Sequence, residues 1–300
     1  MKTKYRSLKT GILQGIRVLD LSRMLSGPYA TMLLADHGAE VIKIESSEGD
    51  TSRRSGPFNE SDKKKEWSGY FVSLNRNKKS IHLNLKNEVD LVFLKKLIEK
   101  SDVLVENFRP GVMKRLGLSF DEVSKINSRI VYGSISGFGS EVFGESPYKN
   151  WPSYDVVAQA MGGLISLTGY DERTPLKVGP GIADIFSGSL LSFGLLASIL
   201  KSRTSGQAQY VEVAMYDAIV SMCERAVYQY DFNKVIPKPE GNGHPLLAPF
   251  GIYNAKDGFV AIGIVEDTYW NVLKKIIGSE TLTFAESTVT CPEVVSAITR

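Results

Sequence analysis

The stretch GIRVLDLSRMLSGPYATMLLADHGAEVIKIE, residues 15–45, contains one complete strand–helix–strand pattern. The apolar runs Ile16–Leu21 and Glu40–Ile44 have the length of buried strands, and Pro28–Asp36 between them has helical spacing. Such alternation predicts parallel strands joined by a crossover helix. The first strand continues into SRMLSGP rather than GxGxxG, so a nicotinamide-dependent dehydrogenase is disfavoured.

The same alternation continues along the chain and predicts an α/β fold. Its large domain is a Rossmann-like open parallel sheet, and linkers join it to a smaller α+β domain. We expect a large domain over residues 1–225, a linker over 226–240 and a small domain over 241–300. Further strands are predicted at Ser80–Leu85, Asp102–Val105, Ile130–Ile135, Gln209–Ala214, Phe250–Tyr253 and Phe259–Ile264, and helices at Asn87–Lys100, Ser119–Ile126, Tyr154–Met161 and Asp184–Leu200.

The segment from Ser46 to Asn77 is rich in serine, glycine, lysine and charge, and it has little periodicity. We interpret it as a long surface excursion. The charge runs Lys63–Lys65 and Arg76–Lys79 are expected to be solvated surface, as such runs usually are.

Composition excludes several classes of protein. The chain has 300 residues, of which 43% are hydrophobic and 23% charged, which suits a folded chain with a sizeable core. The net charge of +3 is too small to indicate a nucleic-acid surface. Cys223 and Cys291 form no CxxC pattern, and the apolar run Ser189–Leu200 is too short to span a bilayer. We therefore expect a cytoplasmic protein without membrane or nucleic-acid partners.

The common catalytic motifs are missing from the sequence. It has neither a Walker GxxxxGK[ST] motif nor an HExxH motif, and His37, His82 and His244 are scattered. Neither a metal site nor a Ser/His/Asp triad is indicated.

Six blocks that occur in order carry a specific resemblance. They are residues 15–45 above, NRNKKSIHLNLK (75–86), DVLVENFRPGVMKRLGL (102–118), YDVVAQAMGGLISLTG (154–169), VGPGIADIFSG (178–188) and GQAQYVEVAMYDA (206–218). Together they resemble the family III CoA-transferases, the CaiB/BaiF family that includes the formyl-CoA transferases. The resemblance covers about residues 11–258.

The resemblance implies that Asp184 is a nucleophile that attacks an acyl-CoA thioester. The expected path is an aspartyl anhydride followed by an aspartyl-CoA thioester, and it needs no permanently bound cofactor because the CoA thioester is the substrate. A small carboxylic acid is the expected acceptor. From the residues alone, Asp184 could instead be an ordinary cap at a helix N-terminus.

Other site residues are expected around Asp184. Gln159 and the pair Gly162 and Gly163 are candidate oxyanion donors, although the glycines could equally serve close helix packing. Tyr154 stands where related racemases have a histidine. The Gly241–His244 loop resembles one that shields the anhydride in family members.

The resemblance also implies a CoA-binding set. Lysine and arginine side chains would meet phosphates and an aromatic ring would lie against adenine. The expected contacts are Leu25, Ser26, Leu83, Asn84, Lys86, Asn107, Phe108, Arg109, Arg115, Trp151, Pro152 and Ser153. Ser46 replaces an arginine of the family pattern.

Two alternatives stay open. One is an α-methylacyl-CoA racemase, which is disfavoured because the phenol of Tyr154 is a poor base at neutral pH. The other is an inactive, truncated CoA-binding protein, because relatives have a C-terminal segment that returns to the large domain. We expect that segment to be missing after Arg300. The family resemblance also implies a homodimer of interlocked chains, if the segment is not essential.

Overall fold

The computed structural model describes residues 11–245 and 247–278 and divides the chain into two compact units. The first unit comprises residues up to Gly162 and Gly179–Cys223; the second comprises Gly163–Val178 and the residues from Glu224 onward. The second unit thus includes an internal segment, 163–178, that the sequence does not single out. Helix α10 (Glu224–Asn233) occupies much of the range predicted to be a linker.

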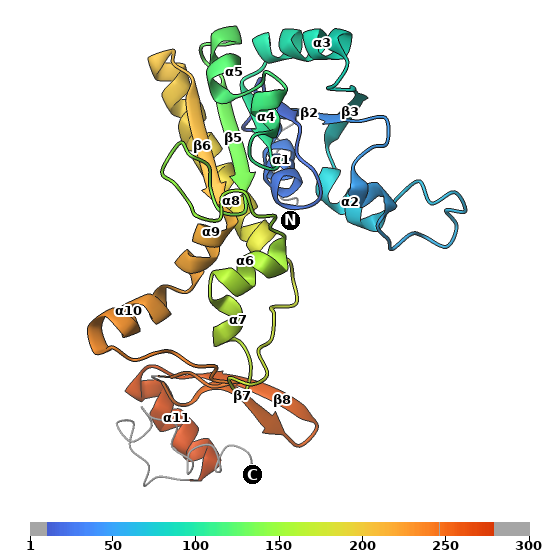
Figure 1. Ribbon diagram of the computed structural model, residues 1–300. Coiled ribbons are helices and arrows are strands. Elements are labelled where there is room, and N and C mark those ends of the chain that lie inside the picture. Colours follow the sequence, from blue (N-terminus) through green and yellow to red (C-terminus); the bar gives the residue numbers. More distant parts are fainter. Residues whose placement is uncertain (1–10, 246, 279–300) are drawn as a thin grey trace, which may run out of the picture. The chain divides into compact units, whose positions relative to one another are not determined.

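The first unit is built on a six-stranded parallel sheet (Figure 1), which confirms the predicted Rossmann-like fold. Its strand order is β3-β2-β1-β4-β5-β6, so the order reverses between β1 and β4. In such sheets, ligands bind beyond the carboxyl ends of the strands at this reversal. The strands are β1 (Arg17–Asp20), β2 (Glu40–Glu45), β3 (Lys78–His82), β4 (Val103–Glu106), β5 (Val131–Ser136) and β6 (Gln209–Ala214).

Helices cover both faces of this sheet. One face carries a hydrophobic core that includes Leu94 and Ile98 of α3 (Glu88–Glu99) and Val123 of α5 (Phe120–Ile126). The other face is covered by α1 (Ser26–Asp36) and α8 (Ile182–Ser205). The remaining helices of the unit are η1 (Thr51–Arg54), α2 (Gly69–Asn75), α4 (Val112–Arg115), α6 (Asp155–Met161) and α9 (Met215–Met222).

Helix α8 is long and apolar enough, by length and composition, to pass as a membrane span. Core helices of folded domains pass the same test, and α8 packs against α1, β5 and β6. Gly188 of α8 faces α1 so closely that an added Cβ would lie 2.6 Å from the Ser26 carbonyl oxygen. The Ser192 hydroxyl, one turn further on, donates to the Ala30 carbonyl at 3.2 Å. The α1–α8 contact therefore depends on small residues.

The surface excursion predicted between Ser46 and Asn77 is partly wrong. The segment contains η1 and α2, and Phe71 and Leu74 are buried. Lys63–Lys65 are exposed, as expected. The side chain of Lys78, from the second charge run, is instead buried and pairs with Asp20 at 2.9 Å. Because Asp20 is fully buried in the sheet, a cation is needed to offset its charge.

The second unit is small and mixes helices with an antiparallel hairpin. The hairpin is formed by β7 (Phe250–Ala255) and β8 (Gly258–Gly263), and α11 (Asp267–Ile277) contributes the buried Trp270. The short helix α7 (Leu164–Leu167) comes from the internal segment. The Gly241–His244 loop packs within this unit, and an added Cβ at Gly241 would lie 3.0 Å from the Tyr170 ring.

The α1–α8 contact gives a first testable prediction. Gly188→Ala should lower the free energy of unfolding by about 1–3 kcal/mol, because the new methyl group meets backbone that cannot move aside cheaply. Gly179→Ala is the matched control, since nothing lies within 4 Å of its added Cβ. Urea unfolding measures both. Equal stability of the two variants would contradict the close contact.

Candidate active site

Asp184 lies in the first turn of α8 but does not cap that helix. Gly181 is the N-cap residue, and a glycine has no side chain that could cap the helix. The Ala183 N–H instead donates to Asp155 Oδ1 at 2.8 Å, so a carboxylate from α6 serves the start of α8. The reading of Asp184 as an ordinary N-cap is therefore wrong, and its carboxylate is available for other partners.

The partner of the Asp184 carboxylate is Ser26, the first residue of α1. Hydrogen bonding by the backbone N–H and the hydroxyl of Ser26 acts to lower the pKa of this carboxyl. The Asn107 side-chain amide donates to the Ser26 Oγ at 3.2 Å, which leaves the hydroxyl proton for Asp184. The positive end of the α1 dipole also favours a negative charge here. The carboxylate thus meets the N-terminus of a second helix.

The electrostatics of the site raise the basicity of Asp184. Burial and the nearby charge of Asp155 raise the pKa of its carboxyl to about 6, against the opposing hydrogen bonds from Ser26. The group is still mostly ionised at pH 7. A carboxylate with a raised pKa is a stronger nucleophile than an ordinary aspartate, so the arrangement suits covalent catalysis.

Two residues of this site were missed by the sequence reasoning. Asp155 accepts hydrogen bonds from the Gln159 side-chain amide at 2.7 Å and from Ala183. Tyr70 of α2 is half-buried, and its pKa is raised to about 12 by burial and by the charges of Asp184 and Asp50. Asp155 could have been suspected as an acid next to Tyr154 at a helix start. Tyr70 gave no signal, because its helix lies in the supposed excursion.

The residues expected as oxyanion donors have structural partners. Gln159 is fully buried, and its amide donates to Asp155. The Gly162 N–H donates to the Ala158 carbonyl at 2.9 Å, and an added Cβ would lie 2.5 Å from Ile219. Close packing of α6 on α9 therefore accounts for Gly162. Gly163 belongs to the second unit, where it precedes α7 with a φ of 92°.

The expected CoA contacts follow the carboxyl ends of three strands in the first unit. Leu25 and Ser26 follow β1, Leu83 to Lys86 follow β3, and Asn107 to Arg109 follow β4. Strands β1 and β4 flank the point where the strand order reverses, whereas β3 is the outermost strand on one side of the sheet. The Leu83 side chain belongs to the core, so only its backbone could meet a ligand there.

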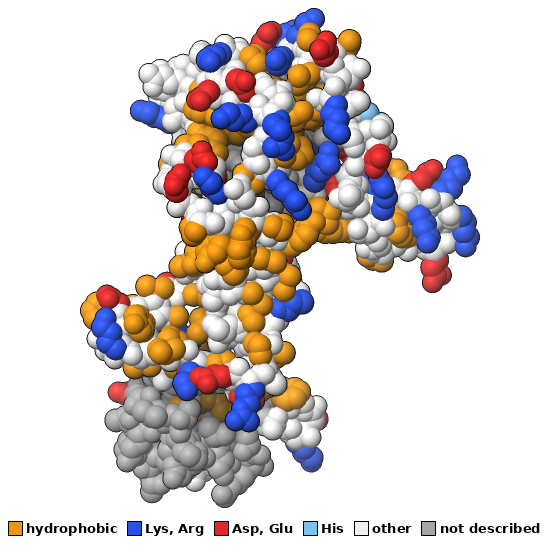
Figure 2. Space-filling model, in the orientation of Figure 1, with side chains coloured by type: hydrophobic (Ala, Val, Ile, Leu, Met, Phe, Trp, Pro, Cys, Tyr) orange, Lys and Arg blue, Asp and Glu red, His pale blue; other side chains and the backbone are white. Residues whose placement is uncertain are grey.

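The charged members of this set face solvent. Lys86, Arg109 and Arg115 are exposed, and Figure 2 shows lysine and arginine side chains on the face around α4. Arg115 ends the short helix α4. Phe108 is half-buried with the Arg23 guanidinium 5.3 Å from its ring centroid. Exposed cations and an aromatic side chain are groups that suit a phosphate-bearing nucleotide.

The stretch before α6 lies against the end of β5. An added Cβ on Gly137 would lie 2.3 Å from the Cβ of Ser153, so the two backbones pass closely. Trp151, Pro152 and Tyr154 are exposed. They could be covered by a bound ligand without rearrangement of the core.

The charge of Asp155 gives the second testable prediction. Asp155→Asn should lower the pKa of Asp184, because it removes the negative charge while keeping an acceptor oxygen for Ala183. The carboxyl carbon-13 shift of Asp184, followed against pH, measures this. Asp121→Asn, on an exposed turn of α5, is the control and should leave the titration unchanged. An unchanged or raised midpoint in Asp155→Asn would contradict the assignment.

Comparison with known proteins shows which sequences this chain resembles. The chain is 43% identical to the succinyl-CoA:mesaconate CoA-transferase of Haloarcula marismortui over 88% of this chain and 66% of that protein. It is 36% identical to the acetyl-CoA:oxalate CoA-transferase of Acetobacter aceti over 91% of this chain and 68% of that one. The chain thus spans about two thirds of the length of these relatives.

Solved structures with the same fold also match this chain. A CaiB/BaiF family protein from Brucella suis matches with a TM-score of 0.83 and 31% identity, covering 97% of this chain and 77% of that one. A protein from Mycobacterium tuberculosis matches with a TM-score of 0.82 and 29% identity, covering 96% and 77%. The family model for CoA-transferase family III matches residues 13–296. The chain therefore belongs to CoA-transferase family III.

Proposed function

We propose that the protein transfers CoA from an acyl-CoA donor to a free carboxylic acid, with Asp184 as the covalent carrier. The observation that carries the proposal is the Asp184 carboxylate, held by Ser26 at the helix start beside the strand-order reversal. Its pKa of about 6 leaves it ionised and nucleophilic at neutral pH.

The transfer follows from the chemistry of this carboxylate. Asp184 attacks the thioester carbonyl, the carbon–sulfur bond breaks, and CoA thiolate leaves behind a mixed anhydride. The thiolate then attacks the Asp184 carbonyl of the anhydride, which releases the donor acid and forms an aspartyl-CoA thioester.

The second half repeats these steps in reverse. The acceptor carboxylate attacks the aspartyl thioester to give a new anhydride and free thiolate. The thiolate attacks the acceptor carbonyl, which forms the new acyl-CoA and restores Asp184. No net energy input is required, since one thioester is exchanged for another.

We infer that the acceptor is a dicarboxylic acid. The matched proteins are named for transfer to mesaconate and oxalate, and a succinate–glutarate CoA-transferase of Agrobacterium fabrum is 34% identical over 89% of this chain. CoA would lie along the carboxyl ends of the strands, near Ser26, Lys86 and Arg109. Residues 1–225 would form the catalytic domain. We place the enzyme in the cytoplasm.

The nucleophile is tested by Asp184→Asn. This variant should lose CoA transfer by a factor of about 10³ or more, while its affinity for CoA stays within about threefold, because the amide keeps the shape but cannot form an anhydride. Transfer is followed by chromatography with succinyl-CoA and mesaconate, and affinity by calorimetry. Retained turnover would remove Asp184 from this role.

The same samples separate transfer from racemisation. In deuterated solvent, a transferase leaves the α-carbon of the donor acyl group unlabelled while CoA moves. Rapid exchange of the α-proton without CoA transfer would favour the racemase instead.

We further propose that the protein forms a homodimer. Helix α8 exposes Leu190, Phe193, Leu196 and Leu200 along one side, and such an apolar stripe is typical of a covered surface. Light scattering after size-exclusion chromatography should give twice the 33.1 kDa chain mass. A folded monomer at micromolar concentration would contradict the dimer.

A further inference from the structure

The loop from Ser22 to Ser26, which joins β1 to α1, is held in a conformation that it would not adopt unaided. Met24 has a φ of 64°, a left-handed conformation that costs a residue with a side chain about 1 kcal/mol or more. Such a conformation persists only where surrounding groups hold it. The loop ends on Ser26, the partner of Asp184.

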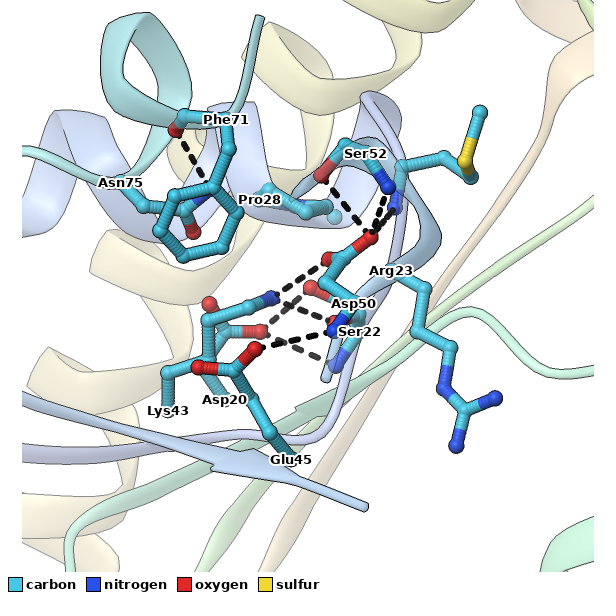
Figure 3. Close-up of polar contacts among 12 residues, drawn as sticks. Asp20, Ser22, Arg23, Pro28, Lys43, Glu45, Asp50, Ser52, Phe71 and Asn75 are labelled. Carbon is cyan, nitrogen blue, oxygen red and sulfur yellow. Dashed lines mark hydrogen bonds and ion pairs between the residues drawn. The ribbon is translucent and has the colours of Figure 1, made fainter. Parts of the chain in front are cut away.

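A buried ion pair beneath this loop supplies the restraint. Lys43 of β2 pairs with Asp50 Oδ2 at 3.0 Å, and both side chains are 1% exposed. Lys43 Nζ also donates to the Ser22 carbonyl at 2.8 Å, while the Met24 N–H donates to Asp50 Oδ1 at 3.2 Å. Figure 3 shows Lys43 pointing toward both Asp50 and Ser22. The ion pair thus forms hydrogen bonds with the loop at Ser22 and at Met24.

Asp50 is itself fixed in place. Its Oδ1 accepts hydrogen bonds from the Ser52 N–H at 3.0 Å and the Ser52 hydroxyl at 2.9 Å, and its own N–H donates to Glu45 Oε2 at 2.9 Å. Glu45 is held in turn by two bonds from Arg53, each of 2.7 Å. The carboxylate therefore belongs to a connected network with little freedom to shift.

Asn107, which follows β4, forms a second set of hydrogen bonds with the loop. The Asn107 side chain accepts a hydrogen bond from the Arg23 N–H and donates to the Arg23 carbonyl, both at 2.8 Å. Asn107 also donates to the Ser26 Oγ. With Arg23 held by Asn107 and Met24 by Asp50, the position of Ser26 is fixed two residues further along.

We propose that Asp50 is a positioning residue for the reaction, acting through Met24 and Ser26 on Asp184. Only the expected loss of kcat rests on the proposed function, because it presupposes that the protein transfers CoA. Asp50 reaches the loop through Met24, and its other partners are Lys43, Ser52 and Glu45. Without it, Met24 would relax, Ser26 would withdraw its two hydrogen bonds, and Asp184 would lose the donors that favour its charged form.

The test is Asp50→Asn, which keeps the size and one acceptor oxygen but removes the negative charge opposite Lys43. Three changes are expected: faster amide hydrogen exchange at residues 22–26, an upward shift of about 0.5–1 in the pKa of Asp184, and at least a tenfold loss of kcat for CoA transfer. The pKa is read from the carboxyl carbon-13 shift.

Glu48→Gln is the matched control. Glu48 lies in the same segment and pairs with Arg54 at 2.9 Å, but both side chains are largely exposed. This variant should change neither the exchange rate of the loop nor the titration of Asp184. If Asp50→Asn lowers thermal stability but leaves both readouts at wild-type values, its role is only structural and the proposal is overturned.

A second variant keeps the test decisive if Asp50→Asn does not fold. Lys43→Met combined with Asp50→Asn removes both buried charges, which is tolerated far better than one unpaired charge. It still lacks the bond from Lys43 to Ser22, so the loop should exchange faster and the pKa of Asp184 should rise. Wild-type values for both would overturn the proposal.

Amide hydrogen exchange of the loop and the titration of Asp184 can both be measured without turnover. Failure of the proposed function can therefore be distinguished from failure of the positioning role. If the wild-type protein transfers CoA between no tested acids, the proposed function fails, while changed exchange and titration still support the coupling of Asp50 to Asp184. If transfer is robust but unaffected by Asp50→Asn, the proposed function stands and the positioning role is overturned.

Discussion

Helices α1 and α8 approach so closely at Gly188 that no side chain fits between them, and the rest of the site depends on this contact. An added Cβ would lie 2.6 Å from the Ser26 carbonyl oxygen. One turn earlier on α8, Asp184 reaches the N–H and hydroxyl of the same serine. The contact that closes one face of the sheet thus also delivers the carboxylate to a helix N-terminus.

The surroundings of Asp184 combine opposing effects on its charge. Burial and Asp155 raise its pKa, whereas the hydrogen bonds from Ser26 lower it. The balance lies near 6, which keeps the group ionised at neutral pH but more basic than a solvated aspartate. A carboxylate that first attacks a thioester and later leaves from an anhydride would benefit from this intermediate value. The buried ion pair of Lys43 and Asp50 supports the loop that ends on Ser26.

Much of the fold could be predicted from the sequence because its strands are apolar and its helices periodic. The helix predicted at Ser119–Ile126 begins with a capping box, in which the Ser119 N–H donates to the Glu122 carboxylate at 2.9 Å. Asp184 was found because its flanking sequence resembles that of a known family. The site roles assigned to Gln159, Tyr154 and the CoA contacts stay predictions.

What the sequence could not reveal depends on contacts between distant residues. Lys78 looks like part of a solvated charge run, yet Asp20, 58 positions away, makes its burial favourable. Tyr70 lies in a segment without periodicity, so neither its helix nor its place near Asp184 was foreseen. Asp155 serves the start of α8 from another helix, a role that local capping rules do not describe. In each case the contacting residue lies far away in the sequence and comes close only in the folded chain.

The central claim is that Asp184 becomes covalently acylated, and hydroxylamine trapping tests it most directly. The protein is mixed with succinyl-CoA, treated with hydroxylamine and digested, and the peptide containing residues 178–188 is weighed by mass spectrometry. The account predicts conversion of the Asp184 carboxyl to a hydroxamate that depends on the acyl-CoA and is lost in Asp184→Asn. An unmodified peptide during active CoA transfer, or a hydroxamate at another residue, would contradict it.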